Sequence, residues 1–166
     1  MKKLSIILSV MFGCNIFAAE VDVDGDFNNF KRSWALSTQR IGTAELIREN
    51  GVNFVQLASE NNKKGQIGIY TARGIAAEKG DRISISADIK GGPVTISIIE
   101  YGNKKFLTNQ VKKFPQSDTR QNCSVAFTVE NPKTDLIRVS FKVLKGAVAT
   151  VSNVKADMSV SGEEGK

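Results

Sequence analysis

The chain has 166 residues, of which 41% are hydrophobic and 24% charged, enough for one globular domain with a full two-layer core. It contains no histidine, which excludes Ser-His-Asp and Cys-His catalysis as well as histidine metal sites. The net charge is +6, and lysine pairs lie near predicted turns. Solvated loops explain such pairs, and attraction to acidic glycans or to a phosphate-rich cell surface is the alternative. We expect no nucleic-acid partner, because basic and aromatic residues do not interleave.

The first 19 residues have the pattern of a secretory signal peptide: two lysines, an apolar run and a small-residue end. The apolar run is too short to serve as a stable transmembrane segment. We therefore expect a secreted or periplasmic protein whose mature chain starts at Ala19 or Glu20. Gly13-Cys14 is similar to the end of a bacterial lipobox, so a lipid anchor on Cys14 stays open as the alternative.

An aromatic group follows the acidic start of the mature chain. Phe27 and Phe30 flank Trp34, the single tryptophan. A buried plug under one end of a β-sandwich is the expected role of these rings, with a ligand-stacking surface as the alternative.

Two elements with strong local signals come next. Residues 43–57 predict a β-hairpin, because Asn50-Gly51 is the preferred pair for a type I′ turn. Residues 66–72 predict a strand with Ile67 and Ile69 on one face and Tyr70 on the other.

The central stretch, residues 80–101, alternates apolar and polar side chains on both sides of Gly91-Gly92. Two alternating runs around a glycine pair indicate an antiparallel hairpin, because glycine supplies the positive φ of a tight turn. We expect this hairpin to form the centre of the fold.

The second half continues in the same manner. We expect a short strand over 106–111 and a loop over 112–122, then strands over 123–129, 136–144 and 147–158. Cys123 alternates with apolar residues, so its thiol is expected to be buried and not disulfide-bonded. About nine strands predict an all-β, single-domain jelly-roll sandwich of two antiparallel sheets over residues 20–158. The tail, 159–166, has no visible anchor and is expected to be disordered.

Four stretches of the sequence match the motifs of a known family. The matching features are DGDF with Trp34 near the start, KGDRISISADIKG at Lys79–Gly91, SVAFTVENPKTDLIRVSFKV, and the closing GAVATVSNVKADM. They resemble the galactose-binding-like β-sandwich carbohydrate-binding modules found beside bacterial glycoside hydrolases, of the family 4, 9, 16 and 22 type. The resemblance covers about residues 22 to 158. It implies binding of poly- or oligosaccharide, by a stand-alone protein or by an accessory to glycoside hydrolases.

The resemblance also implies a structural calcium site, and the sequence departs from the family there. Asn28 follows Phe27 where these modules often carry Glu, and Ser152-Asn153 stands in place of a late acidic pair. Calcium needs six to eight oxygen ligands with negative charge among them. The remaining candidate ligands are Asp24, Asp26 and Asp157. The family also commonly has a tryptophan before the strand that matches 123–129, and Arg120 stands near that place.

Sugar binding requires aromatic faces for pyranose C–H groups and polar side chains for hydroxyl groups. Tyr70 and Tyr101 both point away from the apolar faces of their strands. Gln66 shares a face with Tyr70, and Arg138 lies on another polar face. These four are the candidate ligand-binding residues, with ordinary surface roles as the alternative.

Three classes of function remain open at the level of sequence. The favoured one is a secreted, monomeric, non-catalytic carbohydrate-binding protein with no certain cofactor. The second is a structural or adhesion sandwich of the cell envelope without a sugar site. The third is a small glycosidase with paired carboxylates, for which Asp88 and Glu100, expected on adjacent strands, are the candidates.

Overall fold

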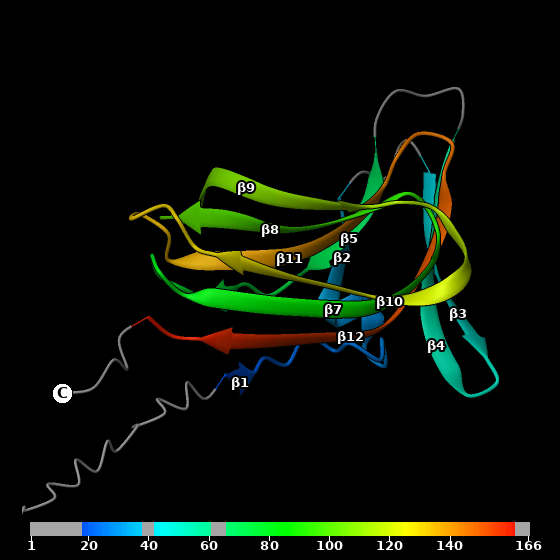
Figure 1. The fold of residues 1–166 in the computed structure, drawn as a ribbon, viewed down its shortest axis with the longest axis horizontal. Helices are drawn as coiled ribbons and strands as arrows, with labels where there is room; N and C mark the ends of the chain where they lie inside the picture. Colours follow the sequence, from blue (N-terminus) through cyan, green and yellow to red (C-terminus); the bar gives the residue numbers. More distant parts are fainter. Residues whose placement is uncertain (1–17, 38–41, 61–65, 162–166) are drawn as a thin grey trace, which may run out of the picture.

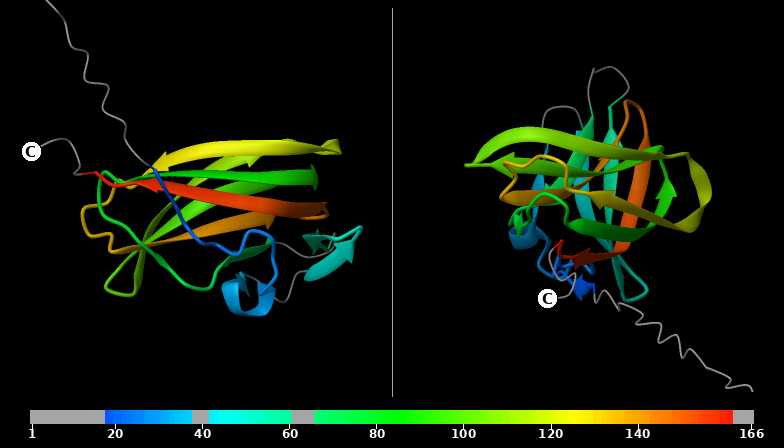
Figure 2. Two further views of the ribbon diagram at one scale, coloured as in Figure 1. Left: turned by 90° about the horizontal axis from the view of Figure 1, so that it is seen from below. Right: turned by 60° about the vertical axis from the view of Figure 1, so that its left-hand side comes forward.

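The computed structural model describes residues 18–37, 42–60 and 66–161, which form two antiparallel β-sheets packed face to face (Figures 1 and 2). The predicted all-β sandwich is therefore confirmed. Most of the predicted signal peptide, including Cys14, lies outside the described residues, as do the 61–65 loop and residues 162–166.

The first sheet, called sheet A, has the strand order β10-β7-β12-β4-β3, with β1 paired to β12. The predicted hairpin with Asn50-Gly51 is confirmed as β3 and β4, and these two residues have φ values of 51° and 80°. The strands of sheet A are β1 (Ala19–Glu20), β3 (Gly42–Glu49), β4 (Val52–Ser59), β7 (Arg82–Gly91), β10 (Ser117–Thr128) and β12 (Val148–Ser159).

The second sheet, called sheet B, has the order β2-β5-β11-β8-β9, with β6 paired to β11. A single turn of helix, α1 (Phe30–Ser33), precedes the first strand of this sheet. No helix in the described part of the chain has the length and apolar character to cross a membrane. The strands of sheet B are β2 (Trp34–Leu36), β5 (Ile67–Thr71), β6 (Ile75–Ala76), β8 (Val94–Gly102), β9 (Lys105–Phe114) and β11 (Leu136–Val143).

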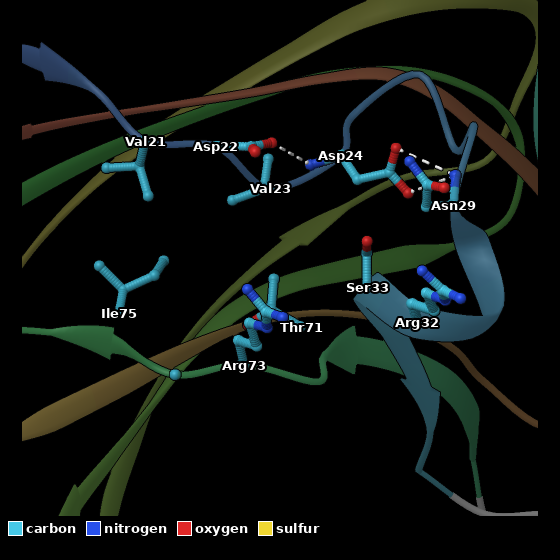
Figure 3. Close-up of a pocket in the computed structure, with 11 residues that line it drawn as sticks. Val21, Asp22, Val23, Asp24, Asn29, Arg32, Ser33, Thr71, Arg73 and Ile75 are labelled. Atoms are coloured by element: carbon cyan, nitrogen blue, oxygen red, sulfur yellow. Dashed lines mark hydrogen bonds between the residues drawn. The ribbon is translucent and has the colours of Figure 1, made fainter.

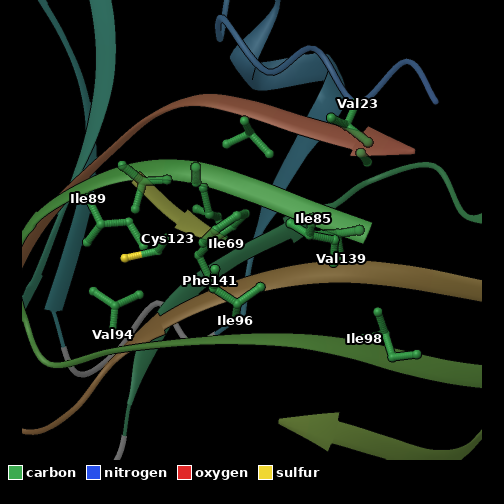
Figure 4. Packing of buried hydrophobic residues seen from close by; sticks show 14 of the residues in the cluster. Val23, Ile69, Ile85, Ile89, Val94, Ile96, Ile98, Cys123, Val139 and Phe141 are labelled. Carbon is green, nitrogen blue, oxygen red and sulfur yellow. The ribbon is translucent and has the colours of Figure 1, made fainter. Parts of the chain in front are cut away.

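The core lies between the sheets and is built by the alternating residues of both (Figure 4). The predicted plug is confirmed, since Trp34 is 3% exposed and its ring centroid lies 5.5 Å from that of Phe27. Cys123 is a free, buried thiol, as expected, and burial raises its pKa.

The central hairpin predicted over 80–101 is wrong. β7 belongs to sheet A and β8 to sheet B, so Gly91-Gly92 carries the chain from one sheet to the other. Alternation of apolar and polar residues shows only that each strand has one buried face. The same alternation arises when two strands pair in one sheet and when they face each other across the core. The glycines are still required, because both have positive φ and a Cβ on Gly91 would lie 2.3 Å from the Val148 carbonyl oxygen.

The loop predicted over 112–122 is also wrong. β9 continues to Phe114 and β10 begins at Ser117, which leaves only Pro115 and Gln116 between them. β9 and β10 lie at the edges of their sheets, where polar residues can occupy strand positions on both faces. The polar residues at 112–122 therefore belong to edge strands and not to a loop.

The C-terminal end is anchored further than expected. The Ser161 backbone N–H donates to Asp81 Oδ1 at 2.8 Å, and its hydroxyl donates to the Lys79 carbonyl at 3.1 Å. Asp81 is itself 3% exposed. The expectation that the tail lacks an anchor therefore does not hold for Ser161, and the domain boundaries at 20 and 158 remain a prediction.

Candidate functional site

The outer face of sheet A carries a groove of about 590 Å³ that extends from the β3–β4 hairpin across β12 and β7 to the start of β10. Val55 and Leu57 on β4 point into the core and are fully buried, so the intervening strand positions place Phe54 and Gln56 on the outer face. Other parts of the groove come from β7, β10 and β12; its polar and charged lining residues are Glu49, Gln56, Lys90, Ser117, Asp118, Arg120 and Thr150.

Arg120 and Phe54 form the central contact of this groove. The Arg120 guanidinium carbon lies 5.8 Å from the centroid of the Phe54 ring, and Nη1 donates to Ser152 Oγ at 3.3 Å. Phe54 is 8% exposed although it lies on the outer face of the sheet. The Arg120 guanidinium thus covers the Phe54 ring. The Ser152 hydroxyl, on β12, which is separated from β10 by β7, holds the guanidinium in place.

The charges of the groove balance each other. Glu49 and Asp118 supply two carboxylates, and Lys90 and Arg120 supply two cations. Together with Gln56 and the hydroxyl groups, they provide hydrogen-bond donors and acceptors around a partly apolar floor. This arrangement suits an uncharged ligand that carries many hydroxyl groups.

Asp88 fixes the strands beside the groove. Asn122 Nδ2 on β10 donates to its Oδ1 at 2.9 Å, and Asn153 Nδ2 on β12 donates to its Oδ2 at 2.7 Å. These two hydrogen bonds hold the pKa of Asp88 below its ordinary value, with the positive charge of Arg120 a smaller cause. The carboxylate therefore ties three strands together across the outer face.

Sequence reasoning missed this groove. Its one local signal is Phe54-Val55, two adjacent apolar residues in an alternating strand, one of which must face outward. A second signal is Arg120, which stands near the place where the resemblance implies a tryptophan and lies over Phe54 in the structure. The register of β10 on β7, which brings Arg120 there, depends on strands that the sequence predicted as a loop.

Three of the four residues predicted to bind sugar lie on the other side of the molecule, on the outer face of sheet B. Tyr70 on β5, Arg138 on β11 and Tyr101 on β8 form one cluster, in which the Arg138 guanidinium carbon lies 5.2 Å from the Tyr70 ring centroid and 5.6 Å from that of Tyr101. Gln66 precedes β5 and is exposed, and no contact joins it to this cluster within the described residues. Three of the four predicted residues are thus brought together.

The two carboxylates considered for a glycosidase are not brought together. Asp88 is on the outer face of sheet A, and Glu100 points into the sandwich from sheet B, fully buried. The expectation that they lie on adjacent strands fails for the same reason as the central hairpin, because β7 and β8 belong to different sheets. Glu100 instead accepts hydrogen bonds from Thr134 Oγ1 at 2.7 Å, the Asn131 backbone N–H at 3.2 Å and Gln110 Nε2 at 3.1 Å.

The candidate calcium ligands lie near two cavities beside the N-terminal segment. Figure 3 shows the larger, of about 430 Å³, with Asp22 and Asp24 on one side and Arg73 across from them. Asp24 and Asp26 both line the second cavity, of about 300 Å³, and Asp157 does not. Asp24 accepts hydrogen bonds from the Asn29 backbone N–H at 3.0 and 3.2 Å. No three acidic, cysteine or histidine side chains in residues 18–37, 42–60 and 66–161 are grouped closely enough to hold a metal ion.

Comparisons with known proteins find similar folds among solved structures only. No family model and no curated protein sequence matches the chain. Among solved structures, the chain is similar to a family 11 carbohydrate-binding module of the cellulase Lic26A-Cel5E from Clostridium thermocellum, with a TM-score of 0.63 and 12% identity over 89% of this chain and 99% of the module. It is similar to a family 16 carbohydrate-binding module, with a TM-score of 0.56 and 12% identity over 81% of this chain and 96% of that one.

A third similar structure is the enzymatically active domain of tailspike protein 4 from bacteriophage CBA120. Its TM-score is 0.64 at 15% identity, and the match covers 85% of this chain but only 21% of the tailspike chain. The chain thus spans about a fifth of that protein. The fold is that of a carbohydrate-binding-module-like β-sandwich. At these identities the likeness concerns the fold alone, and function has to be argued from the site.

Proposed function

We propose that this protein is an exported, monomeric and non-catalytic glycan-binding protein, acting alone or as an accessory to glycoside hydrolases, and that it binds poly- or oligosaccharide in the groove of sheet A. The observation that carries the proposal is the pairing of Arg120 with Phe54 in a groove of about 590 Å³. The fold supports it, since carbohydrate-binding modules share this architecture.

The chemistry of the groove supports a neutral sugar as ligand. Hydroxyl groups need donors and acceptors in fixed positions, and the groove offers both in near balance. The aliphatic stem of Arg120, which covers the Phe54 ring, provides apolar surface for the C–H groups of a pyranose ring. Separation of Asp88 from Glu100, the two carboxylates considered for a glycosidase, favours binding over hydrolysis.

A binding test on the groove decides this proposal. We expect the wild-type protein to be retarded in affinity electrophoresis by at least one neutral polysaccharide from a panel that includes a β-glucan and a xylan. Arg120→Ala should weaken that binding by about tenfold or more, because it removes a charge-assisted donor together with the apolar stem that covers Phe54. Arg82→Ala is the matched control, since Arg82 is an exposed arginine on the same sheet outside the groove.

Two results would count against the proposal. If no polysaccharide in a broad panel retards the folded protein, the structural or adhesion role in the cell envelope becomes the better account. If Arg120→Ala binds as the wild type does, the groove is not the site.

Export is the second part of the proposal, and it rests on the lysines, apolar run and small residues of positions 1–19. We expect the exported protein to have the intact mass of a chain that begins at Ala19 or Glu20. Mass spectrometry of the protein secreted from a bacterial host checks this expectation. A diacylglycerol adduct on Cys14 would instead establish the lipid-anchored alternative.

A further inference from the structure

The two sheets differ in charge. The strands of sheet B carry five basic residues and one acidic residue, whereas those of sheet A carry five basic and six acidic residues. The acidic residue of sheet B is Glu100, which points inward and is fully buried. The outer face of sheet B therefore presents positive charge, and that of sheet A mixed charge. The basic residues of sheet B are Lys105, Lys112, Lys113, Arg138 and Lys142.

Three of these cations share the outer face of sheet B. Lys142 and Lys113 are the register partners of Thr95 on its two sides, and Arg138 is on the same face of β11 as Lys142. None of the three forms an ion pair with a carboxylate in the part of the chain that the structure describes. Asp135, which precedes β11, instead accepts a hydrogen bond from the Asn103 backbone N–H at 2.7 Å.

Arg138 is held in one orientation by aromatic rings. Tyr70 and Tyr101 lie on the two strands that flank β11, and their ring centroids are 5.2 and 5.6 Å from the guanidinium carbon. Contact with two rings restricts the rotamers of a side chain that is otherwise costly to order. The guanidinium is thus oriented before any ligand arrives, and it has no hydrogen-bond partner among the described residues.

Short hydroxyl side chains lie between the cations and rings. Thr95, Ser97 and Ser140 are all on this outer face, and all are buried by their longer neighbours. Ser140 is fully buried, and its Oγ has no hydrogen-bond partner among the described residues, as is also true of Arg138 Nε. Buried polar atoms without partners are uncommon in folded proteins and are ordinarily satisfied by bound water; these two atoms lie below the surface and do not themselves contact a polymer.

We propose that the outer face of sheet B binds acidic polysaccharide, with Arg138 as the central contact to a carboxylate or sulfate group and with Lys113 and Lys142 as flanking cations. A planar guanidinium donates two parallel hydrogen bonds to such anions, and the tyrosine rings beside it offer apolar surface to the sugar. This proposal rests on the proposed glycan binding, but it concerns a second surface, on the opposite sheet from the groove for neutral sugar.

The test uses polysaccharides that differ only in charge. We expect the protein to bind polygalacturonate and to lose most of that binding, about tenfold or more, on the methyl-esterified polymer and on raising the salt concentration. A parallel measurement with dextran sulfate against neutral dextran distinguishes sulfate from carboxylate as the preferred group. Biolayer interferometry on the folded full chain gives the affinities.

Variants locate the surface. Arg138→Gln should weaken binding to polygalacturonate by about tenfold, and Arg138→Lys should recover only part of it, since an ammonium group lacks the planar fork. The double variant Lys113→Gln/Lys142→Gln leaves the arginine–tyrosine contacts in place and provides the same test if Arg138→Gln does not fold. Arg82→Gln, on sheet A and outside the groove, is the matched control and should leave binding unchanged.

Equal binding to the charged and esterified polymers would overturn the proposal, as would equal loss with Arg82→Gln. Binding to duplex DNA or to anionic vesicles with no binding to either acidic polysaccharide would also overturn it, because it would assign the surface to another class of macromolecule. Failure here with intact neutral binding in the Arg120 test leaves the proposed function standing. If the protein binds acidic polysaccharide as expected here but no neutral polysaccharide, the groove of sheet A is rejected as a site and the site on sheet B stands.

Discussion

Trp34→Ala should destabilise the domain by about 3–5 kcal/mol, a substantial share of the roughly 5–15 kcal/mol that stabilises a typical domain. Trp34 is 3% exposed, and its ring packs between Phe27 and Phe141 at centroid distances of 5.5 and 6.0 Å. The indole Nε1 also donates to the Asp24 carbonyl oxygen at 3.3 Å, which ties the N-terminal segment to the sandwich. Removal of the ring leaves a large cavity and an unpaired carbonyl together.

Chemical denaturation followed by far-UV circular dichroism measures this loss, since the variant has no tryptophan fluorescence. Phe106→Ala is the control, because Phe106 is 60% exposed and its ring only meets the edge of Tyr101. That variant should stay within about 1 kcal/mol of the wild type. A Trp34→Ala protein as stable as the Phe106→Ala protein would show that the aromatic plug does not support the fold.

The second large effect is expected from Glu100→Ala, at about 2–5 kcal/mol of lost stability. The carboxyl group of Glu100 is fully buried and accepts hydrogen bonds from Thr134, from the Asn131 backbone and from Gln110. Alanine leaves these three donors without their acceptor in a site that water reaches poorly. The connection between β10 and β11 and the edge strand β9 should both loosen as a result.

Glu100→Gln provides the matched comparison, since an amide oxygen can still accept from Asn131 and Thr134. We expect it to lose about half as much stability as the alanine variant. Urea unfolding of the three proteins under identical conditions measures both differences. If alanine and glutamine cost the same, the hydrogen bonds to the carboxyl oxygens are not what stabilises this end of the sandwich.

The sequence predicted individual strands well because burial of one face leaves a period of two in the residues. It placed Tyr70 and Tyr101 outside, Trp34 and Cys123 inside, and the Asn50-Gly51 turn where the structure has them. Pairing between strands was predicted poorly. Gly91-Gly92 joins two sheets and not two neighbours, and no local pattern distinguishes these cases.

The groove of sheet A could not be predicted because it depends on how several strands pair. Phe54 is on β4 and Arg120 on β10, and two other strands lie between β4 and β10 in the sheet. Their contact depends on the register of all four strands and on the bulge between Ser117 and Gln121. Tyr70, Arg138 and Tyr101 were each identified singly, but their assembly around one guanidinium follows from the order β5-β11-β8, which the sequence does not contain in any local form.

The central claim, that neutral glycan binds in the groove of sheet A, is tested most directly by backbone amide NMR. The protein is titrated with a short oligosaccharide cut from the neutral polysaccharide that it binds most tightly. We expect the largest chemical-shift changes at Gln56, Arg120 and Thr150, which line the groove, and little change at Tyr70 and Arg138 on the opposite sheet. Changes confined to sheet B, or saturating ligand with no change at the groove residues, would contradict the claim.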